Sequence, residues 1–463
     1  MNNNTIWMNV TTSAHWYRPP VGIVRVEQSL CAELKKKYGL RFKLCIWEDG
    51  KFVAYDYQQK PTLTEKKNKL LEDNETALEI EWIFPLVTKK SAIKLIAQGL
   101  LSLAPSGVRP YLNRWLSGIK KILFSLKSVA RRMCEFKFRK QAIKVESVHE
   151  SVHNASVSGN LFSSGDVLIS IGLDWDKSFY KKFYFLRKEL GVKVVTCCYD
   201  LIPVLYPQYC VGEVANIFTS YFLDIADGSD MILCISKQTE KDLIRLMDTT
   251  GGPQVKTKVF PLGDSVPLCN DQKISNDIKV LKDKPFILFV SSIERRKNHE
   301  ILYKAYHLLC KDGHKSALPK LVFVGMQGWG VGDLMNDIRL DPLTSDLIVQ
   351  LNHVTDGELY HLYKSSLFCV FPSFYEGWGL PVAEALSMGK AVIASNQGSL
   401  PEVGRDLVQY VDPWCAREWA NALLKMSTDD LWRRYWEDKV TAEYKQRSWQ
   451  DAAQIVSTAI DEI

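Results

Sequence analysis

The chain has 463 residues, of which 46% are hydrophobic and 24% charged, and these proportions are typical of a soluble globular protein. They exclude a disordered, collagen-like or disulfide-stapled chain, and the length predicts two or three domains. Fifty-nine Lys and Arg against 53 Asp and Glu leave a net charge of +6, so the distribution of charge is more informative than its sum. Eleven cysteines without a CxxC pair predict reduced thiols of a cytoplasmic protein. We expect no secretory signal and no membrane-spanning helix, because the first residues lack a basic start and no apolar run of about 18 residues occurs.

The N-terminal part, residues 1–267, has the pattern of one α/β domain. A helix is predicted at about 24–37, and apolar runs at 166–170, 192–196 and 231–236 predict buried strands. The sequence pattern of this part is looser than that of the C-terminal half, but it still predicts an α/β domain.

A basic, apolar insert at about residues 86–145 interrupts this domain. Its many Lys and Arg alternate with apolar residues at helical spacing, and Glu135 is its only acidic residue. Such a pattern favours helices that lie on an anionic membrane surface. A helical pair packed on the domain with a solvated basic face, or another anionic partner, are the alternatives. Nucleic acid is not expected, because no recognition motif accompanies the charge.

A polar stretch at 268–284 is predicted to link the first domain to a second one at residues 285–447. The second domain alternates apolar runs with helical patterns, and its predicted strands are 284–290, 321–325, 346–349, 367–371 and 391–394. Strands that are apolar on both faces predict a parallel sheet covered by helices on both sides. We therefore expect a doubly wound domain whose ligand lies at the carboxyl ends of its strands.

Two carboxylates flank a turn in this domain, where a strand ends and a helix begins. Glu376 lies in the loop, and Glu384 lies about one turn into the helix that starts near Leu380. Gly377 and Gly379 would let a ligand approach the backbone closely, and the helix N-terminus suits a phosphate. Carboxylates also accept hydrogen bonds from sugar hydroxyls. In the alternative interpretation, Glu376 caps the helix and Glu384 lies on its solvated face.

A second loop at a strand end carries Arg296 and Lys297, which can pair with phosphate oxygens. The alternative is a solvated basic turn. The loop at Trp329 and Gly330 also follows a strand end, and it is a candidate for lining a nucleotide site.

In this order, the segments "IERRKN", "LVFVG", "VTDGEL" and "FPSFYEGWGLPVAEALSMGKAVIASNQGSLPEV" resemble the retaining nucleotide-sugar glycosyltransferases of family 4, typified by bacterial mannosyl- and rhamnosyltransferases. The Glu-x7-Glu pattern of that family is Glu376 and Glu384. Residues 18–26 resemble the family's first glycine turn and helix, and 199–203 resemble its "HDLIP" segment, with Tyr199 where the family often has histidine. Residues 448–463 resemble its last helix, which crosses back to the first domain.

The resemblance implies a GT-B fold, in which two Rossmann-like doubly wound domains face each other across a cleft. Glu376, Arg296 and Lys297 would form the catalytic centre, with Glu376 on the donor-sugar hydroxyls and the two cations on the diphosphate. The nucleotide sugar would otherwise be bound by residues of both domains: Glu384 on the ribose, Gly22 near the diphosphate or sugar, Val354 at the base, and Gly377, Gly379 and Leu380 in the loop. Asp200 and Tyr199 are possible further site residues. No metal and no cofactor is implied, because Arg and Lys would replace a cation.

The predicted function is therefore retaining transfer of a hexose or deoxyhexose from a nucleotide diphosphate sugar, with GDP-mannose favoured. The acceptor would be a surface polysaccharide or an oligosaccharide linked to polyprenyl diphosphate. Such an enzyme would work in the cytoplasm at the inner face of the membrane. A nucleotide-sugar epimerase of the same fold and a non-catalytic nucleotide-sugar-binding module are the alternatives.

Overall fold

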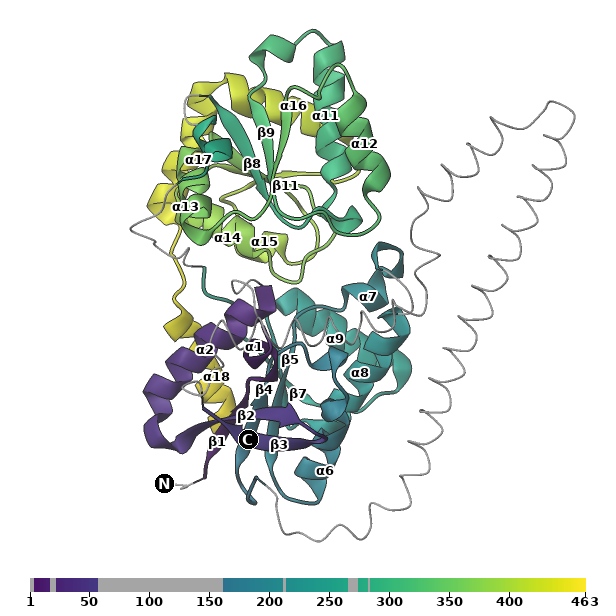
Figure 1. Ribbon diagram of the computed structural model, residues 1–463, viewed down its shortest axis with the longest axis vertical. Helices are drawn as coiled ribbons and strands as arrows, with labels where there is room; N and C mark the ends of the chain where they lie inside the picture. The colour runs from purple at the N-terminus through teal and green to yellow at the C-terminus, as the bar shows by residue number, and fades with distance from the viewer. Residues whose placement is uncertain (1–3, 17–21, 57–160, 211–213, 265–273, 282–283) are drawn as a thin grey trace, which may run out of the picture. The chain divides into compact units, whose positions relative to one another are not determined.

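The structure is a computed structural model that describes residues 4–16, 22–56, 161–210, 214–264, 274–281 and 284–463 (Figure 1). All of these residues lie in one compact unit, Met1–Tyr57 with Leu161–Ile463. The insert at 86–145 lies outside the described residues, as do residues 268–273 and 282–283 of the predicted linker at 268–284.

The first sheet has seven strands in the order β3-β2-β1-β4-β5-β6-β7. Six of them are parallel, and β3 pairs antiparallel with β2. The strands are β1 (Ile6–Asn9), β2 (Phe42–Glu48), β3 (Lys51–Tyr55), β4 (Val167–Ser170), β5 (Lys193–Cys198), β6 (Met231–Cys234) and β7 (Lys256–Val259).

The edge strand β3 departs from the all-parallel sheet expected for this domain. Asp49 and Gly50 connect β2 to β3, with φ of 48° and 79°. Positive φ at both central residues is the geometry of a two-residue hairpin turn, which Asp-Gly favours. The short turn therefore forces the strand back antiparallel.

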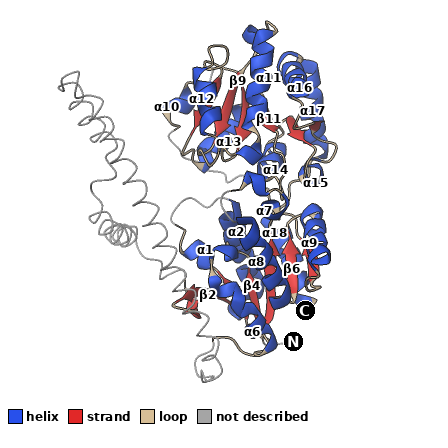
Figure 2. Ribbon diagram, turned by 90° about the vertical axis from the view of Figure 1, so that its right-hand side faces the viewer, coloured by secondary structure: helices blue, strands red, loops and turns tan. Residues whose placement is uncertain are grey.

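The second sheet has six strands, all parallel, in the order β10-β9-β8-β11-β12-β13. Its strands are β8 (Phe286–Val290), β9 (Lys320–Val324), β10 (Ile348–Leu351), β11 (Phe368–Phe371), β12 (Val392–Ser395) and β13 (Gln409–Val411). The strands β11 and β12 are buried along their whole length, because helices cover both faces of the sheet (Figure 2). This is the predicted doubly wound arrangement.

Helices connect the strands of both sheets. In the first domain they are α1 (Thr11–Ala14), α2 (Gly22–Tyr38), α6 (Phe183–Lys188), α7 (Ile202–Leu205), α8 (Val214–Gly228) and α9 (Lys237–Thr250). The following helices are α10 (Asn276–Lys279), α11 (His299–Lys311), α12 (Gly332–Leu340), α13 (Asp356–Ser365), α14 (Leu380–Ser387), α15 (Leu400–Gly404), α16 (Ala416–Thr428), α17 (Asp430–Glu443) and α18 (Trp449–Asp461).

One strand boundary of the second domain differs from the sequence expectation. The strand predicted at 346–349 is β10, which begins at Ile348, because Leu347 still donates a backbone hydrogen bond to Thr344 in the preceding turn. Helix α13 then begins at Asp356, and its N-cap is Thr355, which forms a capping box with Glu358.

The last helix, α18, packs against α2 of the first domain, and Tyr38 and Ser457 share a hydrogen bond of 2.6 Å. The segment that leads into α18 is tied to the end of the first domain at Asp264. The Asp264 carboxylate accepts hydrogen bonds from the Tyr444 hydroxyl and from the Arg447 N–H, the latter at 3.0 Å. The returning chain is therefore fastened to the first domain before α18 begins.

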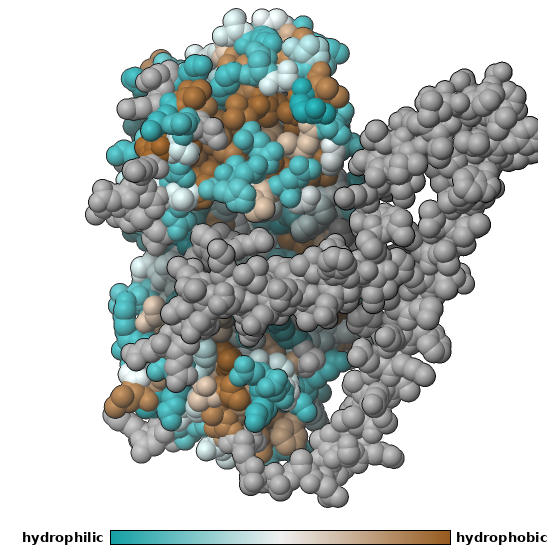
Figure 3. Space-filling view, viewed as in Figure 1, coloured by the Kyte–Doolittle hydropathy of each residue, from teal (hydrophilic) through white to brown (hydrophobic). Residues whose placement is uncertain are grey.

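None of the helices among the described residues is long and apolar enough to span a bilayer. On the face shown in Figure 3, hydrophobic residues of the described part form areas bordered by hydrophilic ones.

Candidate active site

Glu376, Arg296 and Lys297 meet in a buried charge cluster at the carboxyl ends of β8 and β11. Arg296 Nη1 lies 2.8 Å from Glu376 Oε2, and Lys297 Nζ lies 2.6 Å from Glu376 Oε1. Arg296 also pairs with Glu294 at 2.8 Å and donates from Nη1 to the Tyr375 carbonyl at 2.7 Å. The two predicted loops therefore come together, and Glu376 does not cap the helix.

The charges of this cluster determine its protonation. Burial alone would raise the pKa of the Glu376 carboxyl, but the positive charges of Arg296 and Lys297 outweigh it and lower the pKa to about 2. Burial, with the neighbouring Arg296 charge, lowers the pKa of the Lys297 ammonium. Burial would also lower the pKa of Arg296, and the carboxylates of Glu376 and Glu294 outweigh it and raise that pKa. Glu376 is thus a fixed anion throughout the physiological pH range.

The loop that carries both cations is held rigidly. It is a short 3-10 turn, Arg295–Lys297, followed by Asn298 in a left-handed conformation with φ of 60°. The Asn298 side chain donates to the carbonyls of Pro372 at 3.1 Å and Pro413 at 2.8 Å, and thereby connects the loops after β8, β11 and β13. Asparagine tolerates this backbone conformation better than most residues do.

A further loop, which the sequence did not single out, fixes the backbone of Glu376. Ser399 donates to the Glu376 carbonyl from its N–H at 3.1 Å and from its hydroxyl at 3.0 Å. A Cβ on Gly398 would lie 2.6 Å from that carbonyl oxygen, so only glycine fits there. The segment "NQGSL" could have indicated this contact, because it places a glycine and a hydroxyl residue just after the strand β12.

Glu384 is buried in α14 and contacts both domains. Arg25 Nη1 of α2 lies 2.7 Å from Glu384 Oε1, and the Tyr363 hydroxyl of α13 donates to Oε2 at 3.0 Å. Burial raises the pKa of the Glu384 carboxyl, and the Arg25 charge opposes that rise. The alternative that Glu384 faces solvent is therefore wrong. Gly22, with φ of 51°, is the first residue of the helix that carries Arg25.

The segment at Tyr199 and Asp200 packs against the loop that carries Glu376. A Cβ on Gly377 would lie 2.3 Å from the Tyr199 carbonyl and 2.9 Å from the Asp200 Cβ, so glycine permits this approach. The buried Tyr199 hydroxyl donates to the Ile171 carbonyl at 2.6 Å, within the first domain. Burial raises the pKa of the Asp200 carboxyl, and the nearby charge of Arg296 opposes it.

The remaining predicted site residues lie in the same loops or next to them. Gly379, with φ of 105°, is the N-cap of α14, which begins at Leu380. Val354 follows β10 and immediately precedes the N-cap of α13, and no described contact joins it to the charge cluster. It is connected to the site through α13, whose Tyr363 contacts Glu384.

The first domain holds two buried carboxyls that the sequence did not predict. Glu27 Oε1 accepts from the Ser13 N–H at 2.8 Å and from its hydroxyl, whereas Asp174 Oδ2 accepts from the Ser170 hydroxyl at 2.7 Å. The other oxygen of each carboxyl has no hydrogen-bond partner among the described residues. Burial raises the pKa of Glu27 to about 8 and that of Asp174 to about 7.

The described residues contain no group of three or more His, Cys, Asp or Glu side chains arranged to hold a metal ion. The candidate donors to an anion in the second domain are instead Arg296, Lys297 and the start of α14.

Comparison with known proteins finds a family model that matches part of the chain. Residues 270–443, which include Arg296, Lys297, Glu376 and Glu384, match the family model "Glycosyl transferases group 1". This part of the chain is therefore similar to the group 1 glycosyl transferases. The O-antigen chain mannosyltransferase B of Escherichia coli is 29% identical over 264 residues, which are 56% of this chain and 68% of the relative. The serotype-specific mannosyltransferase WbdA of E. coli is 28% identical over 57% of this chain, and the match spans 32% of that longer protein.

Solved structures of other proteins share the fold of this chain. The Anabaena protein Alr3699/HepE, solved in complex with UDP, has a TM-score of 0.54 and 15% identity, and the match covers 99% of this chain and 100% of that protein. Sucrose-phosphate synthase of Thermosynechococcus elongatus has a TM-score of 0.50 and 22% identity over 64% of this chain and 73% of its own. The architecture is accordingly GT-B, as the resemblance implied.

Proposed function

We propose that the chain transfers a hexosyl residue, with mannose the first candidate, from a nucleotide diphosphate sugar to a polysaccharide or lipid-linked oligosaccharide. The observation that carries the proposal is the Glu376 carboxylate held between Arg296 and Lys297, with Glu384 eight residues further along. The relatives named as mannosyltransferases support the choice of mannose, and their name supports a glycan acceptor. GDP-mannose is the favoured donor.

In the proposed mechanism, the donor diphosphate binds beside the guanidinium of Arg296 and the ammonium of Lys297. Both cations donate hydrogen bonds to Glu376, so a bound diphosphate would compete with Glu376 for these donors. The carboxylate oxygens would then be free to accept hydrogen bonds from sugar hydroxyls. As the C1–O bond to the phosphate breaks, negative charge grows on the leaving oxygen and is stabilised by the cations. Glu384, positioned by Arg25 and Tyr363, would hold the ribose.

The acceptor hydroxyl would attack C1 from the face that the diphosphate leaves, so the anomeric configuration is retained. Its proton passes to an oxygen of the departing phosphate, and the products are a glycoside and a nucleoside diphosphate. No protein base is needed, in keeping with a Glu376 carboxyl whose pKa of about 2 makes it a poor proton acceptor. The proposal assigns charge neutralisation to side chains, so chelation of metal ions should leave the rate unchanged.

A transfer assay with a panel of nucleotide sugars and mannose oligosaccharides tests the proposal. We expect transfer from GDP-mannose with retention, read by NMR of the product, and a loss of kcat of roughly a hundredfold or more in Glu376→Gln. Glu300→Gln is the matched control, since Glu300 forms an exposed ion pair with Lys304. Nucleotide binding without transfer would overturn the enzymatic proposal, and product without acceptor would indicate an epimerase.

We also propose that residues 86–145 bring the enzyme to an anionic membrane, because their basic and apolar residues alternate at helical spacing. Flotation with vesicles containing phosphatidylglycerol should recover the full chain and lose it at high salt. A variant without residues 86–145 should remain with the soluble fraction, and equal recovery of both would contradict this part of the proposal.

A further inference from the structure

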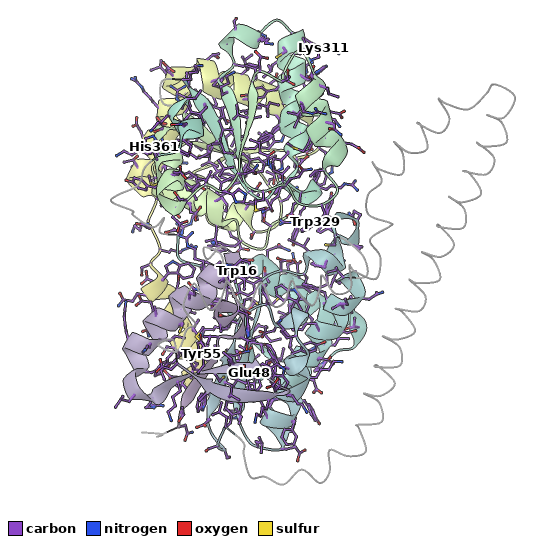
Figure 4. All side chains as sticks on the ribbon, viewed as in Figure 1. Trp16, Glu48, Tyr55, Lys311, Trp329 and His361 are labelled. Atoms are coloured by element: carbon purple, nitrogen blue, oxygen red, sulfur yellow. The ribbon has the colours of Figure 1, made fainter. Side chains whose placement is uncertain are left out.

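Four aromatic residues form a continuous patch beside the charge cluster. We call Tyr209, Phe374, Trp414 and Trp329 the aromatic patch. The rings of Tyr209 and Phe374 are stacked, with centroids 5.3 Å apart and planes at 2°. Trp414 lies against Phe374 at 5.3 Å, and the Trp329 Nε1–H donates to the Tyr209 carbonyl at 2.9 Å. Trp414 therefore contacts the ring of Phe374, and Trp329 is bonded to the backbone of Tyr209 (Figure 4 labels Trp329).

The aromatic patch is joined directly to the proposed reaction centre. The Phe374 N–H donates to the Arg296 carbonyl at 2.9 Å, and Phe374 lies two residues before Glu376. Tyr375, between them, has its ring 5.0 Å from that of Tyr206 and its carbonyl bound to Arg296. A molecule that lies on the patch would therefore lie next to the group that reacts.

Both indoles of the patch are exposed and yet held in place. Trp414 is 60% exposed and Trp329 is 45% exposed. The backbone N–H of Trp414 donates to the Asp412 carboxylate at 2.9 Å, and the carbonyl of the preceding Pro413 accepts from the Asn298 side chain. Large aromatic side chains fixed in this way lose little conformational entropy when a ligand stacks on them.

The patch lies on elements other than those that hold Glu384. Glu384 is bound by Tyr363 of α13 and Arg25 of α2, whereas the patch is built from the loops after β9, β11 and β13 and the 3-10 turn Pro207–Tyr209. In the proposed function the ribose and base of the donor lie on the side of Glu384. The aromatic patch would then be left free to bind another reactant. Phe374 is apolar throughout and Tyr209 is polar only at its hydroxyl, and the faces of such rings suit the C–H faces of sugars.

We propose that the aromatic patch binds the acceptor glycan, with sugar rings of the growing chain stacked on Trp414 and Trp329. The inference rests on the proposed function and adds a binding site for more than one acceptor unit. It makes the enzyme prefer a long acceptor to a single sugar.

The test compares Trp414→Ala and Trp329→Ala with the wild-type enzyme. A linear mannose oligosaccharide and methyl mannoside serve as acceptors, and GDP affinity is measured separately by calorimetry. We expect the KM for the oligosaccharide to rise roughly tenfold in each variant, because one stacking contact is lost. In Trp414→Ala the KM for methyl mannoside and the affinity for GDP should stay unchanged. Trp414→Phe should restore most of the lost affinity.

Tyr435→Ala is the matched control, since Tyr435 is a 53% exposed aromatic residue on α17. An unchanged KM for the oligosaccharide, or a loss of GDP affinity instead, overturns the inference. If the wild-type enzyme transfers no sugar, the proposed function fails by itself. Binding of the oligosaccharide to the wild type and to Trp414→Ala, followed by ligand-observed NMR, still decides whether the patch binds glycan.

Discussion

The two domains each bury a glutamate near the carboxyl ends of their parallel strands, and the two carboxyls have opposite character. Glu376 is flanked by Arg296 and Lys297, and its pKa falls to about 2. Among the described residues, Glu27 has the hydroxyl and the N–H of Ser13 as its hydrogen-bond partners, and its pKa rises to about 8. Burial raises the pKa of both carboxyls, so the two cations beside Glu376 account for the difference between the two pKa values.

The comparison separates the carboxylate that we propose to bind sugar hydroxyls from a carboxyl that joins two helices. A buried carboxyl stays ionised at neutral pH when neighbouring positive charges outweigh its burial, and Glu376 has two such neighbours. A protonated carboxyl such as Glu27 serves to connect elements, here α1 to α2, the helix that presents Arg25. Burial of an acidic residue therefore does not by itself indicate catalysis.

The largest expected effect comes from removing one of the two cations that distinguish Glu376 from Glu27. In Arg296→Gln we expect kcat/KM to fall by roughly a hundredfold to a thousandfold, because a charge-assisted contact to the leaving diphosphate is lost. The pKa of Glu376 should rise toward its ordinary value at the same time. Steady-state kinetics with GDP-mannose measure the first effect.

Arg417→Gln is the control for that variant, because Arg417 forms an exposed ion pair with Asp312. Its kinetics should match those of the wild type. A loss of less than about threefold in Arg296→Gln would remove Arg296 from the proposed mechanism.

The smaller expected effect is on stability and concerns Glu27. The folded state holds a proton on Glu27 up to a pH of about 8, whereas the unfolded chain releases it near 4.5. Between these values the folded state binds more protons, so the free energy of unfolding should fall as the pH rises, by up to about 5 kcal/mol over the whole window. Urea denaturation at pH 5, 7 and 9 measures this slope.

Glu27→Gln should remove this part of the slope, since glutamine stays neutral and has nearly the same shape. Glu33→Gln, on the same helix and paired with Lys36, should keep the slope of the wild type. Equal slopes in the wild type and Glu27→Gln would show that Glu27 is ionised in the folded state.

Local patterns predicted most of the second domain and its charge cluster. Buried strands followed by polar turns placed Arg296, Lys297 and Glu376 at one sheet edge, because the carboxyl ends of parallel strands lie together. The contact of Arg25 with Glu384 joins residues 359 positions apart, and no local pattern contains it. The same holds for Trp329 and Tyr209.

The first domain was predicted less well for two physical reasons. Glu27 lies in an amphipathic helix, where an acidic residue is typical of the solvated face, and only the packing of Ser13 and Gly172 on it shows that it is buried. The turn at Asp49 and Gly50 did carry a clear hairpin signal in the sequence. The strands beside it, β2 and β3, are not among the predicted strands, so the hairpin is not predicted either.

The tie at Asp264 has a mechanical consequence. The chain passes from the first domain to the second and later returns, and the returning segment is bonded to Asp264 through Tyr444 and Arg447. Movement of the returning segment away from Asp264 would break both hydrogen bonds, so the end of the first domain and the returning segment are held together at this point.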